Sequence, residues 1–305
     1  MMQTTDTIFM VRPSSFRRNE ETAVNNYFQA QEVKQDHIAD LAQTEFDNYV
    51  NVLKNAGIRV LTVQDEGLKN TPDSIFPNNV ISFQPNQAIL YPMFAKNRRL
   101  ERSLNYLGQL EKLGFRFEKM IDYSIYEDQE KFLEGTGVLI IDHIHRIVYC
   151  SISDRANIDL LNIYCEEQKY NPISFNAVQQ FNESLLPIYH SNVMMSLGTN
   201  FCLICLETIK SEEEKTQVIQ SLEATNKEII EISEDQMNHF AGNILEVKNK
   251  DQEPIICMST QAYESLREDQ IKQLEKFGRI LHAPLYTIEK YGGGSARCMM
   301  AEVFH

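Results

Sequence analysis

One order of elements recurs along the chain and constrains its fold more than any other feature. An apolar strand is followed by a helix, a second strand and a polar loop that leads into the next strand. Apolar residues three and four apart predict five helices, at about 36–57, 97–113, 154–170, 211–225 and 260–277. At intervals of 51 to 61 residues, loop motifs begin near residues 73, 134, 190, 242 and 293. Such regularity is typical of an array of similar supersecondary units.

Each unit contains two strands joined by a turn, then a helix and a third strand. NVMMSLG and FCLICLE, for example, flank the turn GTN. The final segment MMAEVF has no strand after it, and its natural partner is TIFMVRP near the start. We therefore expect an α/β fold in which residues 1–305 form one domain of five ββαβ units around a pseudo-fivefold axis, closed by pairing of the first and last strands. An ordinary two-domain α/β chain is the alternative, because its alternation looks similar locally.

Composition excludes several classes of partner. The 305 residues are 43% hydrophobic, which is ample for a sizeable core. Lys and Arg number 29 against 43 Asp and Glu, and the resulting net charge of -14 opposes nucleic acid as a partner. No apolar run has the length of a membrane span, and the first residues lack the pattern of a signal peptide. We expect a cytoplasmic protein that does not bind membranes.

Most of the six cysteines lie in apolar strand-like runs and are expected to be reduced core residues. The pair Cys202 and Cys205 has the spacing of a redox or zinc motif, yet both lie in one predicted strand with no second ligand pair. His143 and His145 flank a turn where we expect exposed side chains rather than metal ligands. No metal or cofactor is therefore expected. Cys298 differs, because it follows three glycines at the end of a loop.

Equivalent units would bring the five loops together at one end of the fold. In chain order these loops contain Asp73 and Asn79, then Glu134, then His190 and Asn192, then Asn243 and finally Cys298. A thiol, an imidazole and a carboxylate would thus arrive at one place from three units. Nucleophilic thiol catalysis requires this combination.

The loop motifs PDSIFPNN, LEGTG, YHSNVMM, AGN and GGGSARCM resemble those of the guanidino-group modifying superfamily, the penteins. This superfamily includes arginine deiminase, dimethylarginine dimethylaminohydrolase and the amidinotransferases. The segment MVRPSSFRRNEETAVNNYFQ and the ending GGGSARC are most similar to the citrulline utilisation hydrolases. The resemblance implies a five-bladed α/β propeller and a hydrolase that acts on C–N bonds other than peptide bonds.

The resemblance also implies roles for individual residues. Cys298 would be the nucleophile, His190 the general acid and base, and Glu134 a carboxylate that orients the substrate or the imidazole. Asp73 matches the first acid of an Asp-x-x-Phe loop that contacts the substrate. Asn243, after Ala-Gly, is counted among the substrate-binding residues, and its position in the loop favours a side chain that bridges neighbouring loops.

Two arginines resemble residues that bind the substrate carboxylate. Arg155 lies in SISDRAN, although Ala156 stands where the family has threonine. Arg98 or Arg99 falls where a second such arginine lies in some members. The expected partner is therefore a small amino acid, and a homodimer is left open.

Asn79 and Asn192 stand where members that act on guanidinium cations have carboxylates. A guanidinium carries only hydrogen-bond donors, whereas a neutral ureido group also carries a carbonyl acceptor. The side-chain amide of asparagine can donate a hydrogen bond to that carbonyl oxygen. We therefore expect citrulline to be cleaved to ornithine, carbon dioxide and ammonia. The alternatives are an arginine deiminase or dimethylarginine hydrolase, an amidinotransferase, and a binding protein of the same fold without catalysis.

Overall fold

Three-stranded sheets of one topology recur five times within residues 2–30 and 37–304, the part of the chain that the computed structural model describes. In each sheet two strands pair antiparallel, and one of them pairs parallel with a third. The predicted α/β class is confirmed. Four of these sheets are β3 (Ile81–Gln84), β4 (Gln87–Leu90) and β5 (Lys119–Asp122); β6 (Ile140–Asp142), β7 (Ile147–Ser151) and β8 (Asn171–Phe175); β11 (Met195–Leu197), β12 (Phe201–Ile204) and β13 (Glu228–Glu231); and β14 (Leu245–Lys248), β15 (Pro254–Ser259) and β16 (Arg279–Ala283).

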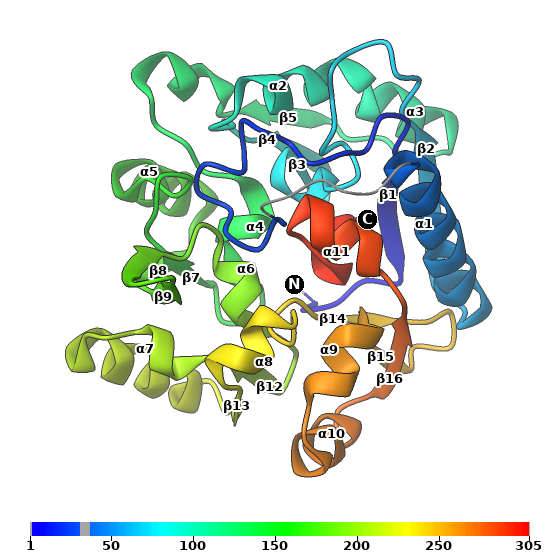
Figure 1. Ribbon diagram of the computed structural model, residues 1–305. Helices are drawn as coiled ribbons and strands as arrows, with labels where there is room; N and C mark the ends of the chain where they lie inside the picture. The colour runs from blue at the N-terminus through cyan, green and yellow to red at the C-terminus, as the bar shows by residue number, and fades with distance from the viewer. Residues whose placement is uncertain (1, 31–36, 305) are drawn as a thin grey trace.

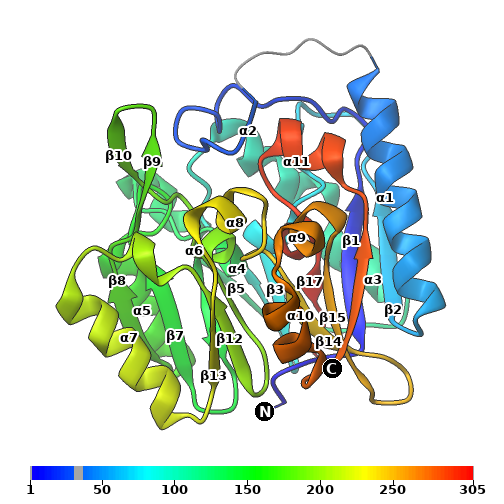
Figure 2. The same ribbon diagram turned by 60° about the horizontal axis from the view of Figure 1, so that its bottom comes forward.

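The fifth sheet joins the two ends of the described chain. Strand β1 (Thr7–Arg12) lies between β17 (Ala301–Glu302), its antiparallel partner, and β2 (Arg59–Gln64), its parallel partner. Figure 2 shows β1 in blue beside β17 in red. Five of the six β1 residues are buried, as expected for a strand covered on both faces. The pairing places the segment before β17, which carries Cys298, against the start of the chain.

Three of the predicted helices form as single helices: α1 (Ile38–Asn55), α5 (Ile158–Gln168) and α7 (Glu212–Ala224). Residue 36, where the first was expected to begin, lies outside the described residues. Helix α1 buries an apolar stripe and packs along the outside of the fold beside β1 and β2, as Figure 1 shows.

The other two predicted helices are broken. The segment expected as 97–113 consists of α2 (Lys96–Arg99), the 3₁₀ turn η2 (Leu100–Leu104) and α3 (Tyr106–Lys112). Asn105 adopts a left-handed conformation there, and its side chain caps the backbone N–H of Gly108. The segment expected as 260–277 divides into α9 (Thr260–Ser265) and α10 (Glu268–Glu275), because Leu266 and Arg267 are extended.

Several short elements were not predicted. The strand expected through PISFNAV ends at Phe175, and a separate hairpin of β9 (Val178–Phe181) and β10 (Ser184–Pro187) follows. The remaining helices are too short to show a period in the sequence. They are α4 (Gly135–Val138), α6 (Ser191–Met194), α8 (Glu234–Asn238) and α11 (Tyr286–Gly292), with the 3₁₀ turns η1 (Pro77–Asn79), η3 (Ser124–Gln129), η4 (Leu206–Thr208) and η5 (Ala296–Met299).

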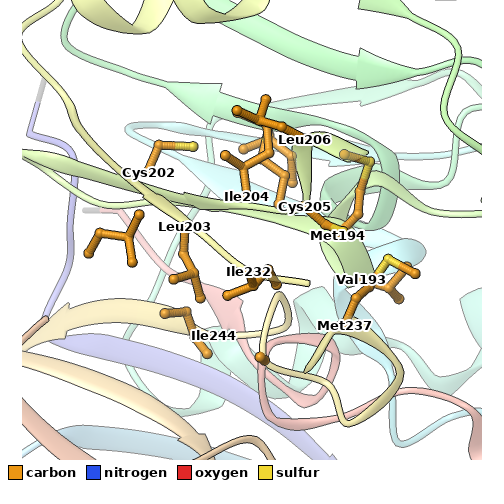
Figure 3. Packing of buried hydrophobic residues seen from close by; sticks show 14 of the residues in the cluster. Val193, Met194, Cys202, Leu203, Ile204, Cys205, Leu206, Ile232, Met237 and Ile244 are labelled. Carbon is orange, nitrogen blue, oxygen red and sulfur yellow. The ribbon is translucent and has the colours of Figure 1, made fainter. Parts of the chain in front are cut away.

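The hydrophobic core includes both cysteines of the Cys-x-x-Cys pair. Figure 3 shows Cys202 and Cys205 among aliphatic side chains of one buried cluster. Both thiols are free. Burial raises the pKa of Cys202 well above its ordinary value and that of Cys205 to about 12, as expected for inert core thiols. The pair therefore belongs to the core. Within the described ranges, no helix combines the length and the apolar character needed to cross a membrane.

Candidate active site

Short helical turns lead from four of the loops into their sheets: η1 before β3, α4 before β6, α6 before β11 and η5 before β17. These turns pack backbone against backbone. A Cβ on Gly135, which has φ of +46°, would collide with the carbonyl oxygen of Asn78. A Cβ on Gly242 would likewise collide with the carbonyl oxygen of Val193. Glycine is required at both positions, and the close approach brings the side chains of different loops together.

Cys298 lies on η5 and is 3% exposed. Its Sγ lies 3.2 Å from Nδ2 of Asn243 and 3.4 Å from Nδ2 of Asn192. Asn243 also donates to the carbonyl oxygen of Asn192 at 2.8 Å, so it bridges two neighbouring loops. Burial raises the pKa of the Cys298 thiol above its ordinary value, while the backbone of Ser295, the two amides and Arg297 oppose this shift.

His190 and Glu134 form a buried pair. Nε2 of His190 lies 2.7 Å from Oε2 of Glu134. Burial lowers the pKa of His190 to about 4 even though Glu134 opposes the shift. The imidazole is therefore neutral near pH 7. Because a carboxylate only accepts, Nε2 carries the proton and Nδ1 keeps the lone pair of a general base. Nδ1 faces Gly137, where a Cβ would collide with it.

Glu134 is held in its charged form by several partners. Its Oε1 accepts from the backbone N–H of Phe94 at 3.0 Å, and Nη1 of Arg155 lies 3.5 Å from Oε2. Burial alone would raise the pKa of this carboxyl, but Arg155, His190 and Arg98 together lower it to about 2. Glu134 thus orients His190 as a carboxylate.

Asp73 presents an unused acceptor. Its Oδ2 accepts from Nδ2 of Asn19 at 2.7 Å and from the hydroxyl of Thr22 at 3.2 Å. Its buried Oδ1 has no hydrogen-bond partner among the described residues. Burial raises the pKa of Asp73, and the charge of Arg98 opposes this. A buried acceptor without a partner is costly, so Oδ1 is suited to a donor from a ligand.

Asn79 and Arg98 lie side by side. Oδ1 of Asn79 accepts from Nη1 of Arg98 at 2.6 Å, while its buried Nδ2 has no partner within residues 2–30 and 37–304. Arg98 also bonds both oxygens of the buried Glu101, at 2.9 and 3.0 Å, and the carbonyl oxygen of Phe76 at 2.9 Å. Arg98 therefore anchors the Asp73–Asn79 loop, and Arg99 instead donates to the carbonyl oxygen of Met93.

Arg155 bonds a different part of the chain. Its Nε donates to Oδ1 of Asn25 at 3.0 Å, and its Nη2 donates to the carbonyl oxygen of Thr22 at 2.8 Å. The guanidinium carbon lies 4.9 Å from the ring centroid of Tyr189. Arg155 is thus positioned between the His190–Glu134 pair and the N-terminal segment.

The segment 13–30 covers the site, a role that the sequence analysis missed. In Figure 1 this dark blue segment crosses the face where α4, α6 and α11 meet. Asn26 donates to the carbonyl oxygens of Gly292 and Gly293 at 3.3 Å, and Gln29 donates to that of Gly292 at 3.1 Å. The only sequence signal was the family-like motif MVRPSSFRRNEETAVNNYFQ, because the segment has no regular period.

All nine predicted site residues are at most 3% exposed and lie in this region. One cavity is lined by six of them: Asp73, Asn79, Arg98, Arg155, His190 and Cys298. The other three stand behind the lining. Glu134 bonds His190, while Asn192 and Asn243 contact the sulfur atom. The loops thus bring a thiol, an imidazole and a carboxylate oxygen without a described partner together.

Neither turn histidine belongs to this site. The expectation of two exposed side chains was wrong for His143, which is buried with Nδ1 2.9 Å from the hydroxyl of Tyr170. His145 lies 2.9 Å from Oδ2 of Asp142. Among the described residues, no group of three or more His, Cys, Asp or Glu side chains could hold a metal ion.

Comparison with solved structures identifies the fold. The N-terminal domain of ArgZ, in a variant covalently bound to a reaction intermediate, is 19% identical with a TM-score of 0.74, over 97% of each chain. Apo ArgZ, an arginine dihydrolase from the ornithine-ammonia cycle in cyanobacteria, is 17% identical with a TM-score of 0.75, over 98% of this chain and 40% of that one. A dimethylarginine dimethylaminohydrolase adduct with S-methyl-L-thiocitrulline is 16% identical with a TM-score of 0.61, over 98% and 99%.

Comparison with curated protein sequences gave no match. A family profile described as N,N dimethylarginine dimethylhydrolase, eukaryotic, matches residues 12–305. The expected superfamily and the expected enzyme class, a hydrolase of C–N bonds other than peptide bonds, are confirmed. The chain belongs to the N,N dimethylarginine dimethylhydrolase family.

Proposed function

We propose that the protein hydrolyses a terminal C–N bond of the guanidino group of arginine or a methylated arginine, with Cys298 as the nucleophile. The observation that carries this proposal is Oδ1 of Asp73, a buried acceptor without a described partner on a residue that lines the same cavity as Cys298. A guanidinium offers only donors, and its charge would stabilise the carboxylate. The family description and the arginine dihydrolase among the similar structures also favour a guanidino substrate over citrulline, which was expected first.

The charges around the cavity support a cationic ligand. Arg98 is paired with the buried Glu101, and Arg155 lies against Glu134. Asp73 takes part in no described ion pair, and burial raises its pKa. A guanidinium beside Oδ1 would supply the missing positive charge and lower this pKa.

In the first step, Nδ1 of His190 takes the proton of the Cys298 thiol, and Sγ bonds to the guanidino carbon. The C–N bond then breaks, and the departing nitrogen receives the proton as ammonia or a methylated amine. His190 next takes a proton from water, whose oxygen bonds to the carbon while the C–S bond breaks, and this proton then passes from His190 to Sγ, which restores the thiol and the neutral imidazole. The products are a ureido amino acid and an amine, and Glu134 keeps His190 in the required tautomer.

The state of Cys298 fits this chemistry. Burial raises the pKa of its thiol, so the free protein holds mainly the protonated form near neutral pH. Asn192, Asn243 and Arg297 stabilise the thiolate in part. A bound cation would stabilise it further, because an opposite charge nearby favours the ionised form, whereas a neutral ureido group would not.

Hydrolysis of a ureido group, as in citrulline, is the second candidate, and the amide of Asn79 favours it. Its Nδ2 is buried without a partner among the described residues. A ureido oxygen could accept from Nδ2 while the adjacent NH₂ donates to Asp73. The same site could therefore act on the first product and release ornithine, carbon dioxide and a second ammonia.

We place the substrate carboxylate on Arg155, where it would replace Oδ1 of Asn25 on the Nε and Nη2 edge. Arg98 would act on the substrate only through Asn79. The five sheets would surround a common axis as a five-bladed propeller within one domain, since their shared topology matches the expected units.

The test is to incubate the purified protein with L-arginine, mono- and dimethylated L-arginine and L-citrulline, and to measure citrulline, ornithine, ammonia and methylamines. Release of citrulline or ornithine from a guanidino substrate supports the proposal. Cleavage of citrulline alone would overturn it in favour of the second candidate. Cys298→Ala is the control, because it should abolish turnover with every substrate.

A further inference from the structure

A buried carboxyl lies behind the loop that carries the nucleophile. Glu289, on α11, is 1% exposed. Its Oε1 accepts from the hydroxyl of Ser295 at 2.6 Å, and Oε2 has no hydrogen-bond partner among the described residues. Glu289 does not line the cavity that holds Cys298. No step of the proposed reaction uses it.

Ser295 lies immediately before η5, the 3₁₀ turn that carries Cys298. Its carbonyl oxygen accepts from the backbone N–H of Cys298 at 3.0 Å and of Met299 at 3.3 Å. Its side chain is held by Glu289 alone among the described hydrogen bonds. A shift of Ser295 would therefore shift the backbone that carries Sγ.

Helix α11 is itself fixed from the outside of the fold. Glu45, on α1, accepts from the backbone N–H groups of Thr287 at 2.8 Å and Ile288 at 3.0 Å. These groups belong to the first turn of α11, where backbone donors lack helical partners. Glu289 thus stands on a helix whose start is held by α1.

The surroundings of the Glu289 carboxyl group favour its protonated, neutral form. Burial raises its pKa to about 7, the hydroxyls of Ser259 and Ser295 oppose this, and the nearby charge of Glu45 adds to it. A neutral acid can accept from Ser295 without placing an unpaired charge behind the thiol. An amide of the same shape can do the same.

We propose that Glu289 is a positioning residue for Cys298, acting through its hydrogen bond to Ser295 and not through contact with substrate. The inference relies on the proposed function only for the role of Cys298 as nucleophile. Misplacing a reacting group by about 1 Å can cost on the order of 100-fold in rate. Loss of this bond should therefore slow the chemistry of the sulfur atom and leave substrate binding unchanged.

The test measures the rate at which iodoacetamide alkylates Cys298, followed by mass spectrometry of the peptide that contains this residue. Four variants are compared: Ser295→Ala, Glu289→Ala, Glu289→Gln and the double variant that combines the two changes to Ala. Both single Ala variants should lower this rate by about tenfold or more. The double variant should be no slower than either, because one shared interaction is lost. Glu289→Gln should restore the rate, since its amide oxygen can accept from Ser295. Turnover with a cleaved substrate should show lower kcat and unchanged KM.

Thr225→Val is the matched control, because the Thr225 hydroxyl donates to the carbonyl oxygens of Ser221 and Leu222 at the end of α7 and does not line the cavity that holds Cys298. It should leave the alkylation rate unchanged. If Glu289→Ala does not fold, Ser295→Ala decides the question. An unchanged rate in Ser295→Ala, or additive losses in a folded double variant, would overturn the proposal. Alkylation needs no substrate, so failure of every substrate assay would overturn the proposed function and leave this result readable.

Discussion

Amide groups, rather than charged side chains, make the direct contacts to the Cys298 sulfur. Asn243 and Asn192 place their Nδ2 atoms within 3.4 Å of Sγ, while His190 and Glu134 form a separate pair. The sequence analysis named all of these residues, because each belongs to a short motif at a loop end. It could not tell which line the cavity, since that depends on how the loops pack.

Asn243→Ala removes both a donor to Sγ and the bridge to the Asn192 backbone. A hydrogen bond to a charged group contributes about 1.5–3 kcal/mol, so kcat should fall by about tenfold or more. Steady-state kinetics with the best substrate measures this. Asn176→Ala, which removes a solvent-exposed contact to Glu214, should match the parent protein. Unchanged kcat in Asn243→Ala would mean that its amide does not stabilise the thiolate.

Glu134→Gln should lower kcat by about 10²- to 10⁴-fold, because an amide can present a donor to Nε2 and reverse the tautomer of His190. Stopped-assay rates at pH 7 measure the effect. Rates equal to those of the parent protein would contradict the proposed base. His190→Ala should be similarly inactive, and the two changes combined should add little further loss.

The His190–Glu134 pair makes the folded protein less stable as the pH decreases. The pKa of folded His190 is about 4 against an ordinary 6.5, so the unfolded chain binds its proton first and stability falls between these values as pH decreases. The pKa of folded Glu134 is about 2 against 4.5, so its contribution is lost below pH 4.5. Melting temperature should therefore fall from pH 6.5 downward. In His190→Asn, the decline between pH 6.5 and 4 should be smaller.

At the scale of elements, regular periods were predictable and irregular segments were not. The strands and α1, α5 and α7 follow their apolar patterns. The breaks at Asn105 and Leu266 occur among good helix formers, so tertiary packing overrides local propensity there. The segment 13–30 has no helical or strand periodicity in its sequence. It is held in place by side-chain hydrogen bonds to distant loops, which a periodic pattern does not reveal.

Asn19 is expected to hold this covering segment closed. It donates to Asp73 and Asn97, and Asn97 donates back to it at 2.7 Å. Asn19→Ala should therefore raise KM by about tenfold, the effect of one lost charge-assisted bond, and speed tryptic cleavage after Arg17 or Arg18. Kinetics and a digestion time course measure both effects. Equal cleavage rates in variant and parent would show that Asn19 does not secure the segment.

At the scale of the whole molecule, five sheets repeat one topology, and the chain ends meet in one of them. The repeat of loop motifs at intervals of 51 to 61 residues predicted similar units, although a two-domain α/β chain shares the same local alternation. The added hairpin β9–β10 departs from the repeat. Figure 2 shows it standing beside the covering segment, which it meets through the rings of Phe181 and Tyr27.

Phe9→Ala tests how far the fold relies on β1. The side chain is fully buried and packs edge-on against Phe83 and Tyr106. Its loss should reduce the free energy of unfolding by about 3–5 kcal/mol, measured by urea denaturation. Leu185→Ala, at a residue 54% exposed, should change it by no more than about 0.5 kcal/mol. A similar small change in Phe9→Ala would contradict the assigned role of β1.

The pairing of β1 with β17 sets an order of events during synthesis. Ile8 and Glu302 are partners although they lie 294 positions apart. At about 5–20 residues per second, the ribosome needs roughly 15–60 s to make the later strand after the earlier one. During that time β1 has only β2 to pair with, and one of its edges stays open. Since Cys298 is made just before β17, the sheet that follows its loop can close only after this residue has been made.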